Sequence, residues 1–207
     1  MLARDHADQE LLQKIWLEEA KSHGVSIHAY CLASDHFHLL LTPERPDSLS
    51  LFMQAVGRRY VSAYNRRHGR SGSLWSGRYR ATVIEAEVHL LDAMVWVETH
   101  GLRAGSVSSA QDDFASSAPH HVGLRSDPLV VDHVLFWALG NTPFERQAAW
   151  RRRLEEALPF KLVHAFSQAM HKGWALVSDE VLPGVEALAG RRLMPKSRGR
   201  PRKFAAP

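Results

Sequence analysis

A buried β-hairpin is the feature that most constrains the fold of this chain. Residues 30–32 and 39–41 are apolar or aromatic, and Pro43 follows them. Such a run, bounded by turn-forming residues, is typical of buried strands. A tight connection over residues 33–35 divides the run. We therefore expect one strand over residues 25–31 and a second over residues 36–41.

Two histidines lie on the second strand of this hairpin. His36 and His38 are separated by Phe37, and side chains two residues apart on a strand point to the same face. Both imidazoles should therefore emerge side by side, while Phe37 faces the other way. This arrangement suits two ligands of one metal ion, or one metal ligand and one phosphate contact. The alternative is a pair of partly buried histidines on the wet face of a sheet.

The flanking segments predict an α+β domain. Apolar residues at helical spacing favour helices over residues 7–22, 49–67 and 87–100, with Gly24 and Gly101 as stops. Residues 69–77 form a Gly- and Ser-rich loop, and residues 79–85 are predicted to be a third strand. The order helix-strand-strand-helix-strand-helix indicates a sheet with helices on one face.

Length and charge limit the class of protein. A chain of 207 residues can hold one domain of ordinary size and an appendage. Its single cysteine, Cys31, excludes an intramolecular disulfide. No apolar run reaches the roughly 18–20 residues that cross a bilayer, so we expect no membrane contact and a cytoplasmic location. The formal charge is only +4, but the arginines are clustered, which favours a polyanionic partner.

Residues 58–80 mix arginines with aromatic residues. Guanidinium groups bind phosphates, and aromatic faces stack on unpaired bases at about 1–3 kcal/mol each. The segment therefore predicts contact with single-stranded or hairpin nucleic acid. Alternatively, Tyr60 and Tyr64 face the core and the arginines form a solvated surface. The candidate DNA contacts are Arg66, Arg67, Trp75, Arg78 and Arg80.

Further blocks of residues accompany the histidine pair in a fixed order: Tyr60-x-x-x-Tyr64-Asn65-Arg66-Arg67, Gly72-x-Leu74-Trp75-x-Gly77-Arg78-Tyr79, Leu90-Leu91, Arg103-Ala104-Gly105, Ser116-Ser117-Ala118, His121-x-Gly123 and Gly140-Asn141-Thr142-Pro143-Phe144-Glu145-Arg146. With these blocks the chain resembles the single-tyrosine HUH transposases, which carry an insertion-sequence-200-like domain. Within them it resembles the REP-associated tyrosine transposase branch. The resemblance implies a ferredoxin-like antiparallel sheet.

One element of the family pattern is missing. Family members begin with a strand before the first helix, but here that helix follows almost directly on Met1. The missing strand would be an inner one, so we expect its loss to leave a long unpaired edge. The sequence allows two interpretations: a misassigned start, or a truncated copy.

The resemblance also implies a catalytic helix. In the family, a tyrosine on this helix attacks a DNA phosphate while a divalent cation polarises that phosphate. A side chain four residues later, on the same helix face, completes the metal site. Counting back from Arg103, the nucleophile position holds Trp96 and the metal position holds His100. An indole has no oxygen nucleophile, so we expect the covalent step to be lost.

The predicted metal ligands are His36, His38 and His100. The family ion is Mg²⁺ or Mn²⁺, whereas three nitrogen ligands favour Zn²⁺ or another transition ion. Three histidines with an open position also describe a hydrolytic zinc site, which would make the protein a water-using nuclease. Alternatively, His100 only occupies the last turn of its helix, where the dipole favours a cation. Glu98 is expected at the surface.

The remainder of the chain is predicted to be helical and then basic. We divide it into a transposase-like DNA-binding domain (1–124), a helical accessory region (125–190) and a basic tail (191–207), with helices over 144–158, 161–172 and 178–189. The tail is expected to be disordered when free. Its Arg-Gly-Arg-Pro-Arg-Lys run resembles an AT-hook, which lies in the A·T minor groove; an unspecific basic tail is the alternative. The contacts would be Arg198, Arg200 and Arg202.

The sequence thus predicts a bacterial, cytoplasmic, nucleoid-associated protein of the transposase family. It would bind single-stranded or hairpin DNA with a divalent metal, but without the tyrosine nucleophile. Two alternatives stay open: an active transposase that uses Tyr60, Tyr64 or Tyr79, and a non-functional truncated copy. Transposases of this chemistry often act as dimers, and the sequence does not indicate an interface.

Overall fold

The computed structural model describes residues 1–195. Its two strands are β1 (Val25–Leu32) and β2 (Phe37–Pro43). Around them lie the helices α1 (His6–His23), α2 (Ser48–Arg67), α3 (Ala86–Glu98), α4 (His100–Arg103), α5 (Ala118–His121), α6 (Val134–Trp137), α7 (Pro143–Glu155), α8 (Phe160–Lys172) and α9 (Leu182–Ala189), with a short 3-10 turn at Ala110–Asp112. The predicted α+β class is confirmed.

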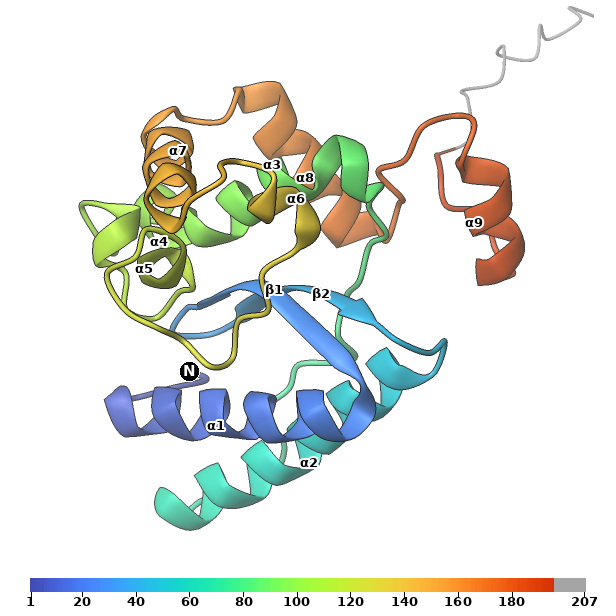
Figure 1. The fold of residues 1–207 in the computed structure, drawn as a ribbon. Helices are drawn as coiled ribbons and strands as arrows, with labels where there is room; N and C mark the ends of the chain where they lie inside the picture. The colour runs from blue at the N-terminus through green and yellow to red at the C-terminus, as the bar shows by residue number, and fades with distance from the viewer. Residues whose placement is uncertain (196–207) are drawn as a thin grey trace, which may run out of the picture.

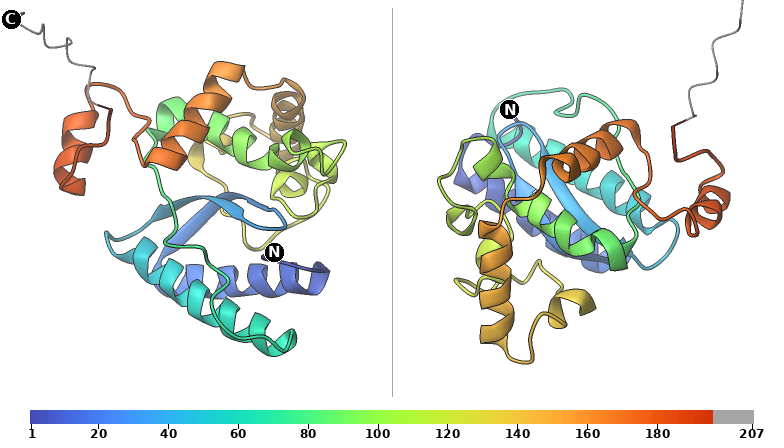
Figure 2. Two further views of the ribbon diagram at one scale, coloured as in Figure 1. Left: turned by 180° about the vertical axis from the view of Figure 1, so that it is seen from behind. Right: turned by 90° about the horizontal axis from the view of Figure 1, so that it is seen from above.

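The two strands lie between two layers of helices (Figures 1 and 2). β1 and β2 pair antiparallel, with Cys31 opposite His38 and a bulge between Ile27 and Ala29. Helices α1 and α2 cover one face. Helix α3 lies against the other, and α6, α7 and α8 pack against α3 on the same side (Figure 1). Helices therefore cover both faces, where the sequence predicted one. The reason is that consecutive apolar residues such as Tyr30 and Cys31 are buried on opposite sides of β1, so each side needs a cover.

Each face of the hairpin has its own hydrophobic core. The core towards α1 and α2 contains Trp16, Tyr30, Phe52 and Tyr60. The other core joins β1 and α3 to the later helices through Phe136, Trp150, Leu154 and Phe166. The predicted helical accessory region therefore shares a core with the histidine-bearing part of the chain.

The predicted third strand does not form. Residues 79–85 contain only an isolated parallel bridge, between Ile84 and Leu176. The backbone N–H of Glu85 donates to the carbonyl of Leu176 (2.9 Å), and the N–H of Leu176 donates to Val83 (2.8 Å). The apolar residues of this segment thus contact the residues after α8. Local periodicity does not indicate this contact. Similarly, α9 begins at Leu182 and not at Ser178.

Later parts of the chain cover the outer edge of β1, which the sequence predicted to be unpaired. Leu32 donates its N–H to Ala115 (2.8 Å), and Ser117 donates its N–H to Tyr30 (3.0 Å). Further along, Val131 donates its N–H to Ile27 (2.8 Å). The backbone groups at this edge are therefore satisfied by residues 115–117 and 131 rather than by a strand.

A buried carboxylate ties this edge to the helices. Glu98, at the end of α3, is fully buried, so its predicted surface position is wrong. Its Oε1 accepts hydrogen bonds from the hydroxyl of Ser117 and from Nδ1 of His121, both at 2.5 Å. Its Oε2 accepts from the indole N–H of Trp150 at 2.8 Å. Such a network is stable only when every member is satisfied, because an unpaired buried charge is costly.

Ser117→Ala should destabilise the fold by about 2–3 kcal/mol, because it removes a donor from the buried Glu98 carboxylate and an acceptor from the Tyr30 N–H. Urea denaturation measures this change. Ser108→Ala, at an exposed serine, is the control and should stay within about 0.5 kcal/mol of the parent. Equal unfolding midpoints for the two variants would contradict the role given to the network.

Candidate metal centre

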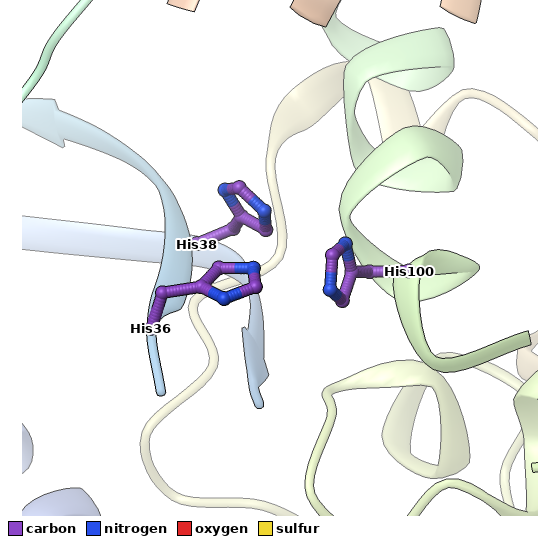
Figure 3. A group of neighbouring side chains, drawn as sticks. All are labelled: His36, His38 and His100. Atoms are coloured by element: carbon purple, nitrogen blue, oxygen red, sulfur yellow. The ribbon is translucent and has the colours of Figure 1, made fainter. Parts of the chain in front are cut away.

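The structure brings the three predicted histidines together (Figure 3). His36 immediately precedes β2, His38 lies within it, and His100 begins α4 just after α3. Their ring centroids are 4.7–5.0 Å apart. One ligand nitrogen of each ring lies within 4.8 Å of those of the other two. The strand and the helix end thus converge on one point.

The alternation of β2 produces this arrangement. His36 and His38 share one side of the strand, and Phe37 packs on the other, with its ring centroid 5.1 Å from that of Trp16. A shift of one residue in the pairing would bury the histidines among apolar residues and expose Phe37. The packing of Phe37 therefore fixes the direction in which both imidazoles point.

Asp35 orients the most exposed of the three histidines. Its Oδ1 lies 2.7 Å from Nδ1 of His36, and this hydrogen bond holds the pKa of the Asp35 carboxyl below its ordinary value. A carboxylate at Nδ1 keeps the proton there and leaves the lone pair of Nε2 for an ion. Sequence analysis did not select Asp35, although its place directly before the histidine pair was a usable signal.

Burial keeps the inner histidines neutral. Desolvation lowers the pKa of His38 to about 3, and the neighbouring His100, His36 and Arg103 add to the effect. The pKa of His100 is lowered by burial and then by His36. Neutral imidazole is the ligating form. The centre is therefore ready to bind a cation without first releasing protons from these two rings.

The donor set fits a divalent transition ion. Three imidazole nitrogens with one exposed side match a three-ligand site with an open position. The alternative for His100 was a position favoured only by the helix dipole. That alternative does not explain why the His100 ring centroid lies 4.7 Å from that of His36 and 4.8 Å from that of His38. The structure therefore brings the His100 ring to the same point as the histidine pair, where it could act as a third ligand.

Trp96, at the predicted nucleophile position, lies beside the centre. It is one turn before His100 on α3, and its ring centroid is 4.7 Å from that of His38. The side chain is only 7% exposed. Arg103, which the sequence analysis used only as an anchor, lies over the Trp96 ring at 5.2 Å and donates to its carbonyl at 2.6 Å. The indole therefore forms one wall of the centre.

The structure does not bring Tyr60 and Tyr64 to the histidines. Both are buried in the core between α1 and α2, on the other face of the hairpin. The Tyr60 hydroxyl donates to the carbonyl of Leu2 at 2.8 Å, and burial raises its pKa. Tyr79 is 45% exposed, on the segment that joins α2 to α3.

The candidate DNA contacts have unequal surroundings. Arg66 and Arg78 are exposed. Arg67 instead forms a bidentate ion pair with Asp5, at 2.7 and 2.8 Å, and also pairs with the buried Asp8. The structure therefore places Arg67 between α1 and α2 as a structural cation.

Trp75 and Arg80 also have protein partners. The Trp75 ring packs edge-on against Phe37, with centroids 5.9 Å apart. Arg80 lies 2.6 Å from Nδ1 of His171 on α8. The tail residues Arg198, Arg200 and Arg202 lie outside the described residues.

One of the comparisons with known proteins gives a match. A family model described as "Transposase IS200 like" matches residues 2–98, which include β1, β2 and the helix that carries Trp96. Neither the curated proteins nor the solved structures yield a match. Within residues 1–195, no helix has the length and apolar character needed to span a membrane.

Asp35→Ala should weaken binding of Zn²⁺ or Co²⁺ to the centre by about 10–100-fold, because His36 loses the acceptor that fixes its Nδ1 proton. Competition with a chromophoric chelator measures the affinity. Asp47→Ala removes an aspartate that lies before α2 and pairs with Arg45, and it should leave the affinity unchanged. If both variants bound the ion with equal affinity, Asp35 would have no part in metal binding.

The metal-free chain should lose stability in acid. The folded state keeps His38 neutral to about pH 3, whereas the unfolded chain protonates it near 6.5. Between these values the unfolded state binds more protons, so stability is full above pH 6.5 and falls as the pH approaches 3. His38→Phe removes the titrating group and should flatten this slope in urea unfolding measured with a chelator present. An unchanged slope would contradict the burial of a neutral His38.

Proposed function

The chain belongs, through residues 2–98, to the IS200-like transposase family, and we propose that it binds single-stranded or hairpin DNA without becoming covalently linked to it. The observation that carries this proposal is the position of Trp96. The residue one turn before His100, against His38, has an indole where the family chemistry needs a phenol. The binding scaffold is present without its nucleophile.

DNA is the partner that the family implies. The single-stranded or hairpin form is our inference from the mixture of exposed arginines and aromatic residues in residues 58–80. Arg66 and Arg78 are the basic side chains best placed to reach phosphates, because both are exposed. Arg67 is excluded from this role by its ion pairs with Asp5 and Asp8.

A divalent ion, when bound by His36, His38 and His100, would supply positive charge for a DNA phosphate. Zinc is the ion that three neutral imidazoles favour, although Mg²⁺ or Mn²⁺ serves the family. Asp35 orients His36 for this ion. The guanidinium of Arg103 lies over the ring of Trp96, the residue that forms one wall of the centre.

We also infer the parts of the function that lie outside the matched residues. The REP-associated branch, which the ordered motifs of the whole chain resemble, is retained as a proposal. The basic tail would add contacts with A·T-rich duplex through Arg198, Arg200 and Arg202. A location at the bacterial nucleoid in the cytoplasm follows from this DNA partner.

A water-using nuclease is the second candidate function. Three histidines, of which His36 is exposed, leave a position at which an ion could present water. This candidate needs no tyrosine, so the position of Trp96 does not exclude it. DNA cleaved without attached protein would distinguish it.

The decisive experiment compares the parent chain with Trp96→Tyr on labelled hairpin DNA, with Mg²⁺, Mn²⁺ or Zn²⁺ added. On a denaturing gel, only Trp96→Tyr should form a protein–DNA adduct. Trp137→Tyr, which introduces the same phenol at a half-exposed site on α6, is the control and should form none.

Three other results are distinguishable. An adduct with the parent chain would contradict the proposal and direct attention to Tyr79. Shortened DNA without an adduct would favour the nuclease. Failure of every folded variant to bind the DNA at all would overturn the proposed binding function.

Arg78→Ala should weaken DNA binding uniformly and reduce the slope of log affinity against log salt by about one, because one phosphate contact is lost. Fluorescence anisotropy at several salt concentrations measures this slope. Arg67→Ala is the matched control: it removes an equal charge that is already paired, and should lower the unfolding midpoint with the slope unchanged. If Arg67→Ala reduced the salt slope and Arg78→Ala did not, Arg67 would be the phosphate contact and Arg78 would not.

A further inference from the structure

A second group of potential metal ligands lies away from the first centre. His120 and His121 end α5, and Asp132 lies in the segment before α6. Oδ1 of Asp132 is 3.4 Å from Nε2 of His120 and 3.6 Å from Nε2 of His121. One ligand atom of each residue lies within 4.8 Å of those of the other two.

Two atoms of this group are buried without hydrogen-bond partners among the described residues. They are Nε2 of His121, whose side chain is 1% exposed, and Oδ1 of Asp132. A buried polar atom left unsatisfied costs about 1–3 kcal/mol. Two such atoms that face each other therefore need a physical explanation.

Glu98 determines whether the His121 nitrogen that faces Asp132 carries a proton or a lone pair. The Glu98 carboxylate accepts Nδ1–H of His121 at 2.5 Å, and it also accepts the N–H of Trp150. With the proton held on Nδ1, the neutral ring has its lone pair on Nε2. That lone pair faces a carboxylate oxygen at 3.6 Å. A cation between these two acceptors would satisfy both of them. Nε2 of His120 makes only a long contact, 3.4 Å, with the same carboxylate oxygen.

The spacing matches two ligands of one ion. Two ligand atoms at zinc's usual bond length of about 2.0–2.2 Å are separated by roughly 3.4 Å in a tetrahedral site. The distances to Asp132 Oδ1 are 3.4 and 3.6 Å, longer than a normal N–H···O hydrogen bond. We propose that His121, Asp132 and His120 bind a second transition-metal ion of the zinc class, which has a structural role.

His120 is the weakest of the three ligands. Its Nδ1 accepts the backbone N–H of Asp127 at 3.0 Å, so in the metal-free chain the neutral ring carries its proton on Nε2. That proton must leave, and the bond to Asp127 must be given up, before Nε2 can bind an ion. His121 and Asp132 therefore dominate the affinity.

An adjacent cavity of about 290 Å³ gives an ion access and room for water ligands. The two arginines that line it are engaged elsewhere. Arg146 donates to the carbonyl of Gly140 at 3.0 Å, with its guanidinium 4.2 Å from the Trp137 ring. Arg125 donates to the Tyr30 hydroxyl and to Asp127. Neither arginine forms an ion pair with Asp132, which leaves its charge for a metal.

The ion would join the segment covering the β1 edge to the buried network. Val131, next to Asp132, donates to Ile27 of β1, and its carbonyl lies 2.6 Å from Nδ1 of His28. His121 is bonded to Glu98 of α3. A metal between Asp132 and His121 would thus fasten the covering segment to α3 and α5, independently of any DNA chemistry at the first centre.

The test counts bound Co²⁺ in chains that lack the first centre. The variant His38→Ala/His100→Ala should bind one equivalent in equilibrium dialysis, against two for the parent. Adding Asp132→Ala should abolish binding; where that chain fails to fold, as judged by circular dichroism, Asp132→Asn is its isosteric replacement. His120→Ala should retain one equivalent with reduced affinity. His164→Ala, at an exposed histidine on α8, is the control and should change nothing.

Thermal unfolding supplies a second measurement. Zn²⁺ should raise the melting temperature of His38→Ala/His100→Ala, and Asp132→Asn should remove this rise. A folded His38→Ala/His100→Ala chain that binds no Co²⁺ would overturn the proposal, and a proton would then be the cation between the two residues. Undiminished binding after Asp132→Asn and Asp132→Ala would also overturn it.

Discussion

The centre depends on the antiparallel pairing of β1 with β2, because that pairing decides which side of the strand each residue faces. Phe37 enters the core that contains Trp16, and its two histidine neighbours are directed towards α3 as a consequence. Hydrophobic packing on one face of the hairpin therefore positions polar ligands on the other.

Buried polar contacts also hold α3 in place beside the hairpin. Glu98 ends the helix that carries Trp96, and its carboxylate collects donors from Ser117, His121 and Trp150. Ser117 also belongs to a segment that covers the outer edge of β1, whereas His121 and Trp150 belong to α5 and α7. The later half of the chain thus supports the position of α3 relative to the hairpin, and the first centre relies on that position through His100.

Features with a local cause could be predicted from the sequence. The hairpin, α1, α2 and α8 follow from periodicity and from stops such as Gly24. The place of His100 beside the histidine pair was expected only from the family resemblance, by counting back from Arg103. Features that depend on a distant partner could not. Nothing near Glu98 shows that Trp150 will reach it, and nothing near residues 79–85 indicates pairing with Leu176. The ion pairs of Arg67 were missed for the same reason, because Asp5 and Asp8 are far from it in the sequence.

The most direct test of the account is a crystal structure of the chain grown with Zn²⁺, with anomalous scattering measured at the zinc edge. The account predicts an anomalous peak bonded to nitrogens of His36, His38 and His100 at about 2.0–2.1 Å, with the Trp96 ring as the adjacent wall. A peak elsewhere with the three imidazoles unbound, or imidazoles turned away from one another, would contradict it.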